Sequence, residues 1–221
     1  MSFTGAMIDL KSLSKKMVLP ERKLESIEQF LAKFPEVREV ILDGMERPVQ
    51  RPKNAEKQKE HYSGKKRMRF HGRETRPWKR TKQKRHTRKH ITGSTRTKRV
   101  ILLSEARAGK IHDKRQLDEA DLVGNIPDDV RIEGDLGFQG LQKEFINIHL
   151  PHKKPRGKEL SEVKKQENKK FSSQRVVCEH AHAGIKRYNA VTAIYRNRVP
   201  NFDDHLMLTA AGLWNFYLEA A

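Results

Sequence analysis

The sequence has a single cysteine, no long apolar run and far fewer acidic than basic residues. Because Cys178 has no second cysteine to pair with, an internal disulfide is excluded. Nothing near Met1 combines a basic start, an apolar run and a small-residue cleavage site, as a secretory signal does. No stretch approaches the roughly 20 apolar residues that a membrane helix needs. We therefore expect a cytoplasmic protein that does not have a membrane as its partner.

The basic residues are concentrated in one block. The chain has 47 Lys and Arg against 28 Asp and Glu, a formal net charge of +19. Residues 51–100 hold 20 bases and 3 acids, whereas residues 101–150 hold 6 bases and 10 acids. A basic block interleaved with Tyr62, Phe70 and Trp78 is typical of nucleic-acid contact, because Lys and Arg release counterions from a polyanion. The alternative is a solvated face or tail that contacts nothing.

The pattern of apolar residues predicts one mixed α/β domain in which helices flank a sheet. Steps of three and four residues, or long helix-forming segments, predict helices at residues 21–34, 114–123, 161–187 and 203–220. Runs of β-branched and other apolar residues predict strands at residues 37–42, 99–103, 130–135 and 145–150. Strands dominate the first part of the chain and helices the last part.

Three carboxylates occupy positions where a site could form. Asp43 and Asp135 each end a predicted strand, and Glu179 lies on the long helix, away from its apolar stripe. Carboxylates are the hard oxygen ligands that Mg²⁺ and Mn²⁺ prefer, and two such ions can cut a phosphodiester. Spacing alone leaves ordinary surface acids as the commoner alternative, since Asp and Glu are abundant.

Other motifs give weaker signals. The glycines of residues 134–140 recur at every third position, which matches neither a dinucleotide-binding fingerprint nor a phosphate-binding loop. His180 and His182 lack the partners of a structural zinc site, so surface or DNA-facing histidines are the better interpretation. For Cys178 we expect a small buried apolar side chain rather than a nucleophile.

Seven segments taken in order resemble the DDE-superfamily transposases of bacterial insertion sequences, in the branch similar to harbinger-type endonucleases. The resemblance covers about residues 20–200, and each segment alone is weakly specific. The segments are ILDGMERPVQRP (41–52), HYSGKK (61–66), KRHT (84–87), IHD (111–113), GDLGFQG (134–140), PHKKPRG (151–157) and RVVCEHA (175–181).

The resemblance implies an RNase H-like fold and a metal-dependent DNA endonuclease. Asp43, Asp135 and Glu179 correspond to the catalytic residues that hold two divalent ions, Mg²⁺ or Mn²⁺. The partners would be transposon ends and target DNA, in the bacterial cytoplasm at the nucleoid, and a homo-oligomer is left open. Asp113 is left open between an auxiliary metal ligand and a structural acid. The residues expected to contact DNA phosphates are Arg47, Lys65, Lys66, Arg85, Lys153, Lys154, Arg156 and Lys186.

The chain departs from the family's pattern in three ways. Residues 67–83, 17 in all, are inserted into a basic strand, and we expect them to leave the sheet at a hairpin or edge. Met45 replaces the usual Thr beside the first Asp. About 40 residues precede Asp43, too few for the usual helix-turn-helix module, so a truncated or inactive copy is expected.

These features predict three regions and leave two rivals to a transposase. The regions are an N-terminal helical remnant (1–35), the endonuclease domain with its insertion (36–200) and a C-terminal helix (201–221). The first rival is a nucleic-acid-binding protein without catalysis, in which the acids are incidental. The second is a fragment that pairs with an intact transposase and inhibits it.

Overall fold

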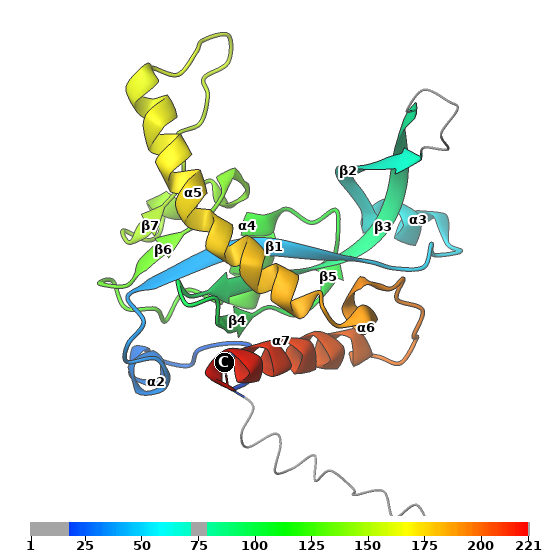
Figure 1. Cartoon of the computed structure of the whole chain (residues 1–221), viewed down its shortest axis with the longest axis horizontal. Coiled ribbons are helices and arrows are strands. Elements are labelled where there is room, and N and C mark those ends of the chain that lie inside the picture. Colours follow the sequence, from blue (N-terminus) through cyan, green and yellow to red (C-terminus); the bar gives the residue numbers. More distant parts are fainter. Residues whose placement is uncertain (1–17, 72–78, 221) are drawn as a thin grey trace, which may run out of the picture.

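The computed structural model describes residues 18–71 and 79–220, without the side chains of residues 64–84. The predicted α/β architecture is confirmed, because helices cover both faces of a seven-stranded mixed sheet (Figure 1). The strands are β1 (Glu39–Pro48), β2 (Tyr62–His71), β3 (Lys79–Ser94), β4 (Val100–Leu103), β5 (Arg107–Ala108), β6 (Arg131–Glu133) and β7 (Ile148–His149). The helices are α2 (Ile27–Lys33), α3 (Ala55–His61), α4 (Asp113–Ala120), α5 (Glu162–Ile185), α6 (Asn189–Thr192) and α7 (Phe202–Ala220), with short 3-10 turns η1 (Leu136–Phe138) and η2 (Leu141–Lys143).

The long strand β3 organises the sheet. Its second half pairs antiparallel with β1 on one side and with β4 and β5 on the other, and its first half pairs with β2. Strand β1 is followed outward by β6 and β7, and all three run parallel. The order across this part of the sheet is therefore β4-β3-β1-β6-β7.

The two faces of the sheet bury separate cores. On one face Phe30 of α2 and Leu117 of α4 pack with Val40 and Leu42 of β1. On the other face Met45 of β1 packs with apolar residues of α5, α6 and α7. Alternation along β1 thus points Val40, Leu42 and Gly44 to the α4 side, and Ile41, Asp43 and Met45 to the α5 side. An α5 side chain can reach Asp43 because of this alternation.

Helices α5 and α7 approach each other closely at a glycine. A Cβ added to Gly184 would stand 2.3 Å from a ring carbon of Trp214, so any side chain there would clash. The Trp214 indole also donates to the Lys98 carbonyl (2.9 Å), which ties α7 to the β3–β4 turn. The predicted long helices at 161–187 and 203–220 are confirmed within two residues at each end.

The N-terminal helix is shorter than predicted. Glu21 forms a parallel bridge with Leu102 beside β4, and its amide donates to the Ile101 carbonyl (2.8 Å). Helix α2 begins only after Ser26, whose hydroxyl accepts from the Gln29 amide (3.2 Å) as an N-cap. Two side chains of the predicted apolar stripe, those of Ile27 and Leu31, are 43% exposed and lie outside the core.

The inserted segment lengthens a hairpin. Residues 67–71 of β2 pair with residues 79–83 of β3, and the hairpin projects from the body of the molecule (Figure 1). Strand β3 continues unbroken into the sheet, so the insertion leaves the pairing of β3 with β1 intact. This agrees with the expectation that the insertion leaves the sheet at a hairpin; residues 72–78, including Trp78, lie outside the described chain.

No helix in the described part of the chain is both long and apolar enough to cross a membrane.

Candidate active site

The two predicted catalytic aspartates lie level with each other, but only Asp135 follows the end of a strand. The prediction that Asp43 ends a strand is wrong, because β1 continues beyond it to Pro48. Strands β1 and β6 are parallel, and Ile41 pairs with Glu133. Two residues further along the chain come Asp43 and Asp135, beyond the point where β6 ends. Because parallel strands in register carry equivalent residues at the same level, Asp43 lies level with the place where the chain leaves β6 at Asp135.

Three side chains from one face of α5 surround the carboxylate of Asp43. The Cys178 thiol lies 3.5 Å from Oδ2, the Arg175 guanidinium 3.6 Å from Oδ1, and Nδ1 of His182 3.7 Å from Oδ2. Positions 175, 178 and 182 recur at the spacing of one helix face. Oδ1 also accepts from the Gly44 amide (2.9 Å), and the side chain of Asp43 is 22% exposed. The carboxylate is therefore held in place but remains open to solvent.

Glu179 lies at the exposed margin of that same face. Residues three and four apart are neighbours on a helix, so Glu179 stands beside His182 and Arg175. Its side chain is exposed, while Ala181 and Ile185 are buried. The prediction that Glu179 points away from the buried stripe of its helix is confirmed.

The carboxylates of Asp113 and Asp135 both lie next to Gly137. A Cβ on Gly137 would stand 2.6 Å from Oδ2 of Asp113 and 2.7 Å from Oδ1 of Asp135, so only glycine fits between these carboxylates. Oδ1 of Asp135 accepts from the Gly137 amide (2.7 Å) and so begins η1. Oδ1 of Asp113 also lies 3.3 Å from the place of a Cβ on Gly44, the neighbour of Asp43.

Asp113 already has a cationic partner in the structure. The ammonium of Lys89, a residue only 4% exposed, is paired with the Asp113 carboxylate and with the Ile111 carbonyl. A buried ammonium requires such partners, because its transfer from water is costly. Of the two roles left open for Asp113, this contact supports the structural one.

The donor chemistry fits a divalent ion better than the spacing does. Asp43, Asp135 and Glu179 offer carboxylate oxygens, the ligands that Mg²⁺ and Mn²⁺ prefer. Across residues 18–71 and 79–220, however, no group of three His, Cys, Asp or Glu side chains is close enough to hold a metal ion. The three carboxylates would have to lie closer together than they do here to hold an ion jointly.

The burial of Cys178 was predicted correctly from the sequence, but the burial of His182 was not. Cys178 is 1% exposed, and burial, followed by the charge of Asp43, raises the pKa of its thiol to about 12. The expectation of a buried, unreactive cysteine is confirmed. For His182 the expectation of a surface histidine is wrong, because its ring is 6% exposed and Nε2 lies 2.7 Å from the Thr92 hydroxyl. Thr92 pairs with Asp43 across β1 and β3, so His182 fills the space beneath α5.

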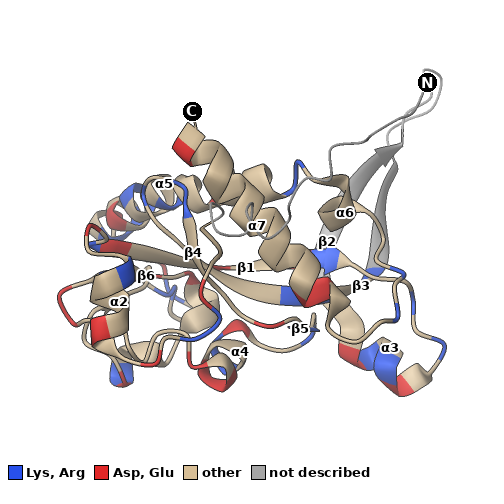
Figure 2. Cartoon of the chain, turned by 90° about the horizontal axis from the view of Figure 1, so that it is seen from below, with Lys and Arg blue, Asp and Glu red and all other residues tan. Residues whose placement is uncertain are grey.

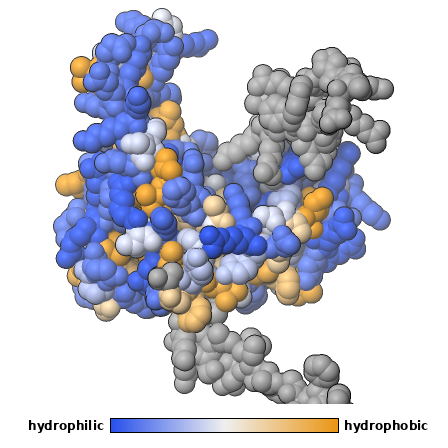
Figure 3. All heavy atoms as spheres, in the orientation of Figure 1, coloured by the Kyte–Doolittle hydropathy of each residue, from blue (hydrophilic) through white to orange (hydrophobic). Residues whose placement is uncertain are grey.

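The residues expected to contact DNA divide into exposed and buried sets. Lys153, Lys154 and Arg156 are exposed in the loop before α5, and Lys186 is exposed at its end. Figure 2 shows Lys and Arg residues along this loop and helix, and Figure 3 shows the start of α5 as a mainly hydrophilic projection. Arg85 is half-buried on β3, and the side chains of Lys65 and Lys66 lie outside the described chain.

The prediction of a phosphate contact for Arg47 does not fit the structure. Arg47 is 1% exposed, and its guanidinium lies 4.4 Å from the centroid of the Tyr195 ring. It also donates to the carbonyls of Ala190 and Asp203 at 3.4 Å. Alternation along β1 points Arg47 to the α5 side, where α6 and the start of α7 cover it. Arg47 therefore stabilises the packing of these helices.

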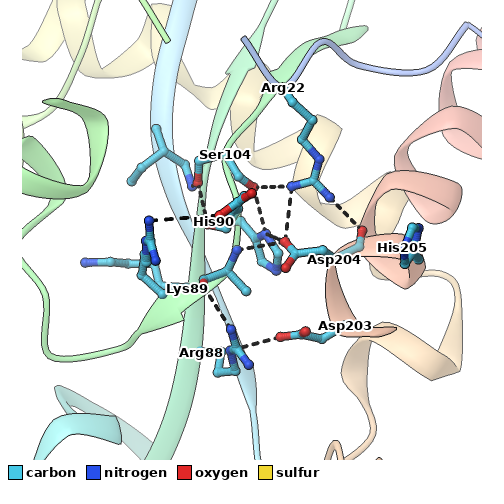
Figure 4. A network of polar contacts seen from close by, with 12 residues as sticks. Arg22, Arg88, Lys89, His90, Ser104, Asp203, Asp204 and His205 are labelled. Carbon is cyan, nitrogen blue, oxygen red and sulfur yellow. Dashed lines mark hydrogen bonds and ion pairs between the residues drawn. The ribbon is translucent and has the colours of Figure 1, made fainter. Parts of the chain in front are cut away.

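A polar network at the start of α7 was not anticipated from the sequence (Figure 4). Oδ1 of Asp204 accepts from Arg22 (3.1 Å) and from the Ala106 amide (2.8 Å), while Asp203 pairs with Arg88 (2.9 Å). The residues Asp203-Asp204 at a helix start were the one available signal, since acids favour the first turn. The network fastens α7 across the ends of β3 and β4.

His90 lies inside this network and should make stability depend on pH. Burial lowers its pKa from 6.5 to about 4. Nδ1 lies 3.1 Å from the Ser104 carbonyl, and Nε2 has no hydrogen-bond partner among the described residues. Between pH 6.5 and 4 the unfolded chain binds a proton that folded His90 does not, so stability is lost as the pH falls through this window. Above pH 6.5 the contribution is constant.

We expect the His90 contribution to the free energy of unfolding to fall by about 2 kcal/mol between pH 7.5 and pH 5, at 1.36 kcal/mol per pKa unit. The measurement is urea unfolding at both pH values for the wild type and His90→Gln, with the exposed His205→Gln as control. His90→Gln should lose that part of the pH dependence, and His205→Gln should keep it. An unchanged pH dependence in His90→Gln would show that other groups cause it.

Comparison with known proteins agrees with the motifs. Residues 42–215 match the sequence profile of the family described as "DDE superfamily endonuclease". A relative from Microchaete diplosiphon, described as "Probable transposase for insertion sequence element IS702", is 30% identical over 207 residues. These residues make up 93% of this chain and 64% of the relative, so the chain spans less than two thirds of that protein's length. No solved structure matches the chain.

Proposed function

Since the chain belongs to the DDE superfamily of endonucleases, we propose that it is the catalytic part of an insertion-sequence transposase that cuts DNA with divalent metal ions. The observation that carries the proposal is that Asp43 of β1 lies level with the end of the parallel strand β6, which Asp135 follows, and that α5, which carries Glu179, packs against Asp43. One acid on a strand, a second just after the neighbouring strand and a third on a later helix is the arrangement that the family's motifs imply.

We also propose that the fold is RNase H-like. The order β4-β3-β1-β6-β7 supports this, with an antiparallel β3 and parallel β1, β6 and β7. In such a fold the first acid lies on the opening strand, the second follows the fourth strand and the third lies on a later helix. Along the chain, β6 is the fourth of these five strands, after β1, β3 and β4. Asp43 on β1, Asp135 after β6 and Glu179 on α5 therefore agree with that order.

The proposed chemistry assigns a role to each of the three acids. Asp43, Asp135 and Glu179 would hold two Mg²⁺ or Mn²⁺ ions, which would activate a water molecule and stabilise the leaving 3′ oxygen. Water would form a bond to phosphorus at the transposon end as the bond to the 3′ oxygen breaks. The freed 3′ hydroxyl would then attack a phosphodiester of the target DNA, joining the strands as the target's own 3′ oxygen leaves.

The exposed bases beside the site would position the DNA. Lys153, Lys154 and Arg156 precede α5, and Lys186 follows it, so they flank the helix that carries Glu179. Contacts of this kind hold phosphates and set the register of the duplex without reading its sequence. Lys65, Lys66 and Arg85, on the β2–β3 hairpin, would extend the contact to the other side of the site.

DNA binding should weaken steeply with salt, and less steeply when these bases are removed. We expect the triple variant Lys153→Gln, Lys154→Gln, Arg156→Gln to lower the salt slope of log Kobs by roughly 2 to 3, at about 0.9 for each phosphate that the variant no longer neutralises. The control is Lys23→Gln, Lys33→Gln, Arg115→Gln, three substitutions on the α2 and α4 side of the molecule. Binding is measured by fluorescence anisotropy from 50 to 300 mM NaCl on any duplex. If the DNA affinity of the wild type did not change with salt, the proposal that a basic surface binds DNA phosphates would be refuted.

The catalytic proposal is tested by nicking of supercoiled plasmid with the purified chain in Mg²⁺ or Mn²⁺, and with EDTA as the metal-free control. Nicking that requires the metal supports an endonuclease. DNA binding without nicking in any metal would favour a nucleic-acid-binding protein that is not catalytic, and inhibition of an intact relative in the same assay would favour an inhibitory fragment.

A further inference from the structure

One arginine contacts all three elements that carry the proposed catalytic acids. Arg96 lies in the β3–β4 turn, where the Thr95 amide donates to the Arg99 carbonyl (2.9 Å). Its guanidinium donates to both carboxylate oxygens of Glu39, at 2.5 and 2.6 Å, and to Glu133 at 3.0 Å. A fourth bond, of 2.6 Å, goes to the Gln174 carbonyl of α5.

The partners of Arg96 lie close in sequence to the proposed catalytic residues. Glu39 is on β1, four residues before Asp43. Glu133 is on β6, two residues before Asp135, and Gln174 is on α5, five residues before Glu179. Glu39 shares the α5 face of the sheet with Asp43, four residues further along β1, and Glu133 lies on the same face because it pairs with Ile41 in the parallel register of β1 and β6.

These contacts are strong ones. A planar guanidinium that donates two parallel bonds to a carboxylate combines charge with fixed geometry. Glu133 is fully buried, and burial raises the pKa of its carboxyl, followed by its hydrogen bond to Glu39, while the charges of Arg96 and Arg131 oppose the rise. The negative charge of the Glu133 carboxylate is therefore stabilised by Arg96 and by Arg131, which lies 3.1 Å away. Lysine could not replace all four bonds, because its ammonium is a compact charge without the planar fork.

We infer that Arg96 is a positioning residue for the active site: it fixes α5 against β1 and β6 and thereby sets the place of Glu179 relative to Asp43 and Asp135. This inference rests on the proposed function. It goes beyond it because Arg96 belongs to none of the motifs that identify the family, and its hydrogen bonds go to Glu39, Glu133 and Gln174 rather than to the three acids.

The test compares Arg96→Lys with Arg99→Lys. Arg99 lies in the same turn, but the ion pairs that its guanidinium makes among the described residues are with the exposed side chains of Glu36 (3.5 Å) and Glu219 (3.8 Å). We expect Arg96→Lys to weaken Mn²⁺ binding in the absence of DNA, and to slow nicking, by 10- to 100-fold, the usual effect of removing a group that supports a metal ligand. The midpoint of urea unfolding should fall modestly, because lysine keeps the positive charge beside buried Glu133 but not the bidentate bonds, and the affinity for DNA should change little. Arg99→Lys should behave as the wild type does.

The single cysteine provides a readout that depends on neither metal nor activity. Cys178 is buried between α5 and β1, so its rate of reaction with a thiol reagent reports how firmly α5 is held. Arg96→Lys should raise this rate at least 10-fold under native conditions, and Arg99→Lys should not. Should Arg96→Lys fail to fold, Glu39→Gln removes the same bidentate pair from the partner's side and is expected to act in the same direction.

The outcomes separate the two proposals. Faster labelling of Cys178 together with weaker Mn²⁺ binding in Arg96→Lys supports the positioning role. Unchanged labelling and unchanged Mn²⁺ binding would overturn it. If the wild type neither binds Mn²⁺ nor nicks DNA, the endonuclease proposal fails. Whether Arg96 fixes α5 against the sheet is then tested by the labelling rates of Cys178 alone.

Discussion

Replacing Asp43 by Asn is expected to reduce metal-dependent nicking roughly 1,000-fold. The substitution keeps the shape of the side chain but removes the negative charge of a proposed metal ligand. A bound metal contributes several kcal/mol to the stabilisation of a transition state, and each 1.36 kcal/mol is a factor of ten in rate. Asp135→Asn and Glu179→Gln should cause losses of similar size, since the three acids would hold the ions together.

The surroundings of these residues make the experiment selective. Asn can still cap η1 in place of Asp135, and Glu179 is exposed, so neither change should unfold the protein. The matched control is Asp128→Asn, an exposed acid in the turn before β6, which should nick as the wild type does. The assay measures conversion of supercoiled to open-circular plasmid, with DNA binding measured alongside. Wild-type rates in Asp43→Asn would place the active site elsewhere.

Removing Asp113 is expected to destabilise the fold rather than to affect the chemistry alone. In Asp113→Ala the ammonium of Lys89 would remain buried without its carboxylate, and loss of one partner of a buried pair costs about 3 kcal/mol or more. The variant Lys89→Met, Asp113→Ala should recover much of this loss, because the uncompensated charge is gone. The measurement is the free energy of unfolding in urea.

A matched acid on the same helix gives the control. Asp118 is exposed and pairs with Lys114 (2.7 Å), so Asp118→Ala should change the free energy of unfolding by less than about 1 kcal/mol. If Asp113→Ala instead kept the stability of the wild type and lost nicking, Asp113 would be a metal ligand rather than the structural partner of Lys89.

The positions of the long elements could be predicted from the sequence. Helices α5 and α7 are long enough for their apolar spacing or length to be unambiguous, and the short apolar run with β-branched Val100 and Ile101 was correctly predicted as a strand, β4. Short elements were less well predicted. The strand expected at residues 145–150 is only Ile148–His149, because residues 146–147 form a turn. The helix expected from Glu21 begins at Ile27, because Glu21 pairs beside β4.

The net charge of the chain predicts the kind of partner, but it does not predict which basic side chains are exposed. The net charge of +19 points to a polyanionic partner wherever the bases lie. It does not distinguish exposed Lys153 from buried Arg47, because burial depends on which helices cover a strand. His182 and Lys89 are likewise buried by elements that lie far from them in the chain.

Local pattern and motifs are enough to predict the α/β class, the family, and the order of Asp43, Asp135 and Glu179 along the chain. Which side chains meet depends on how distant segments pack. Arg96 contacts residues that are 57, 37 and 78 positions away, and Lys89 contacts a residue 24 positions away. Such contacts depend on the register of β1 with β6 and on the crossing of α5 over the sheet, which no single segment encodes.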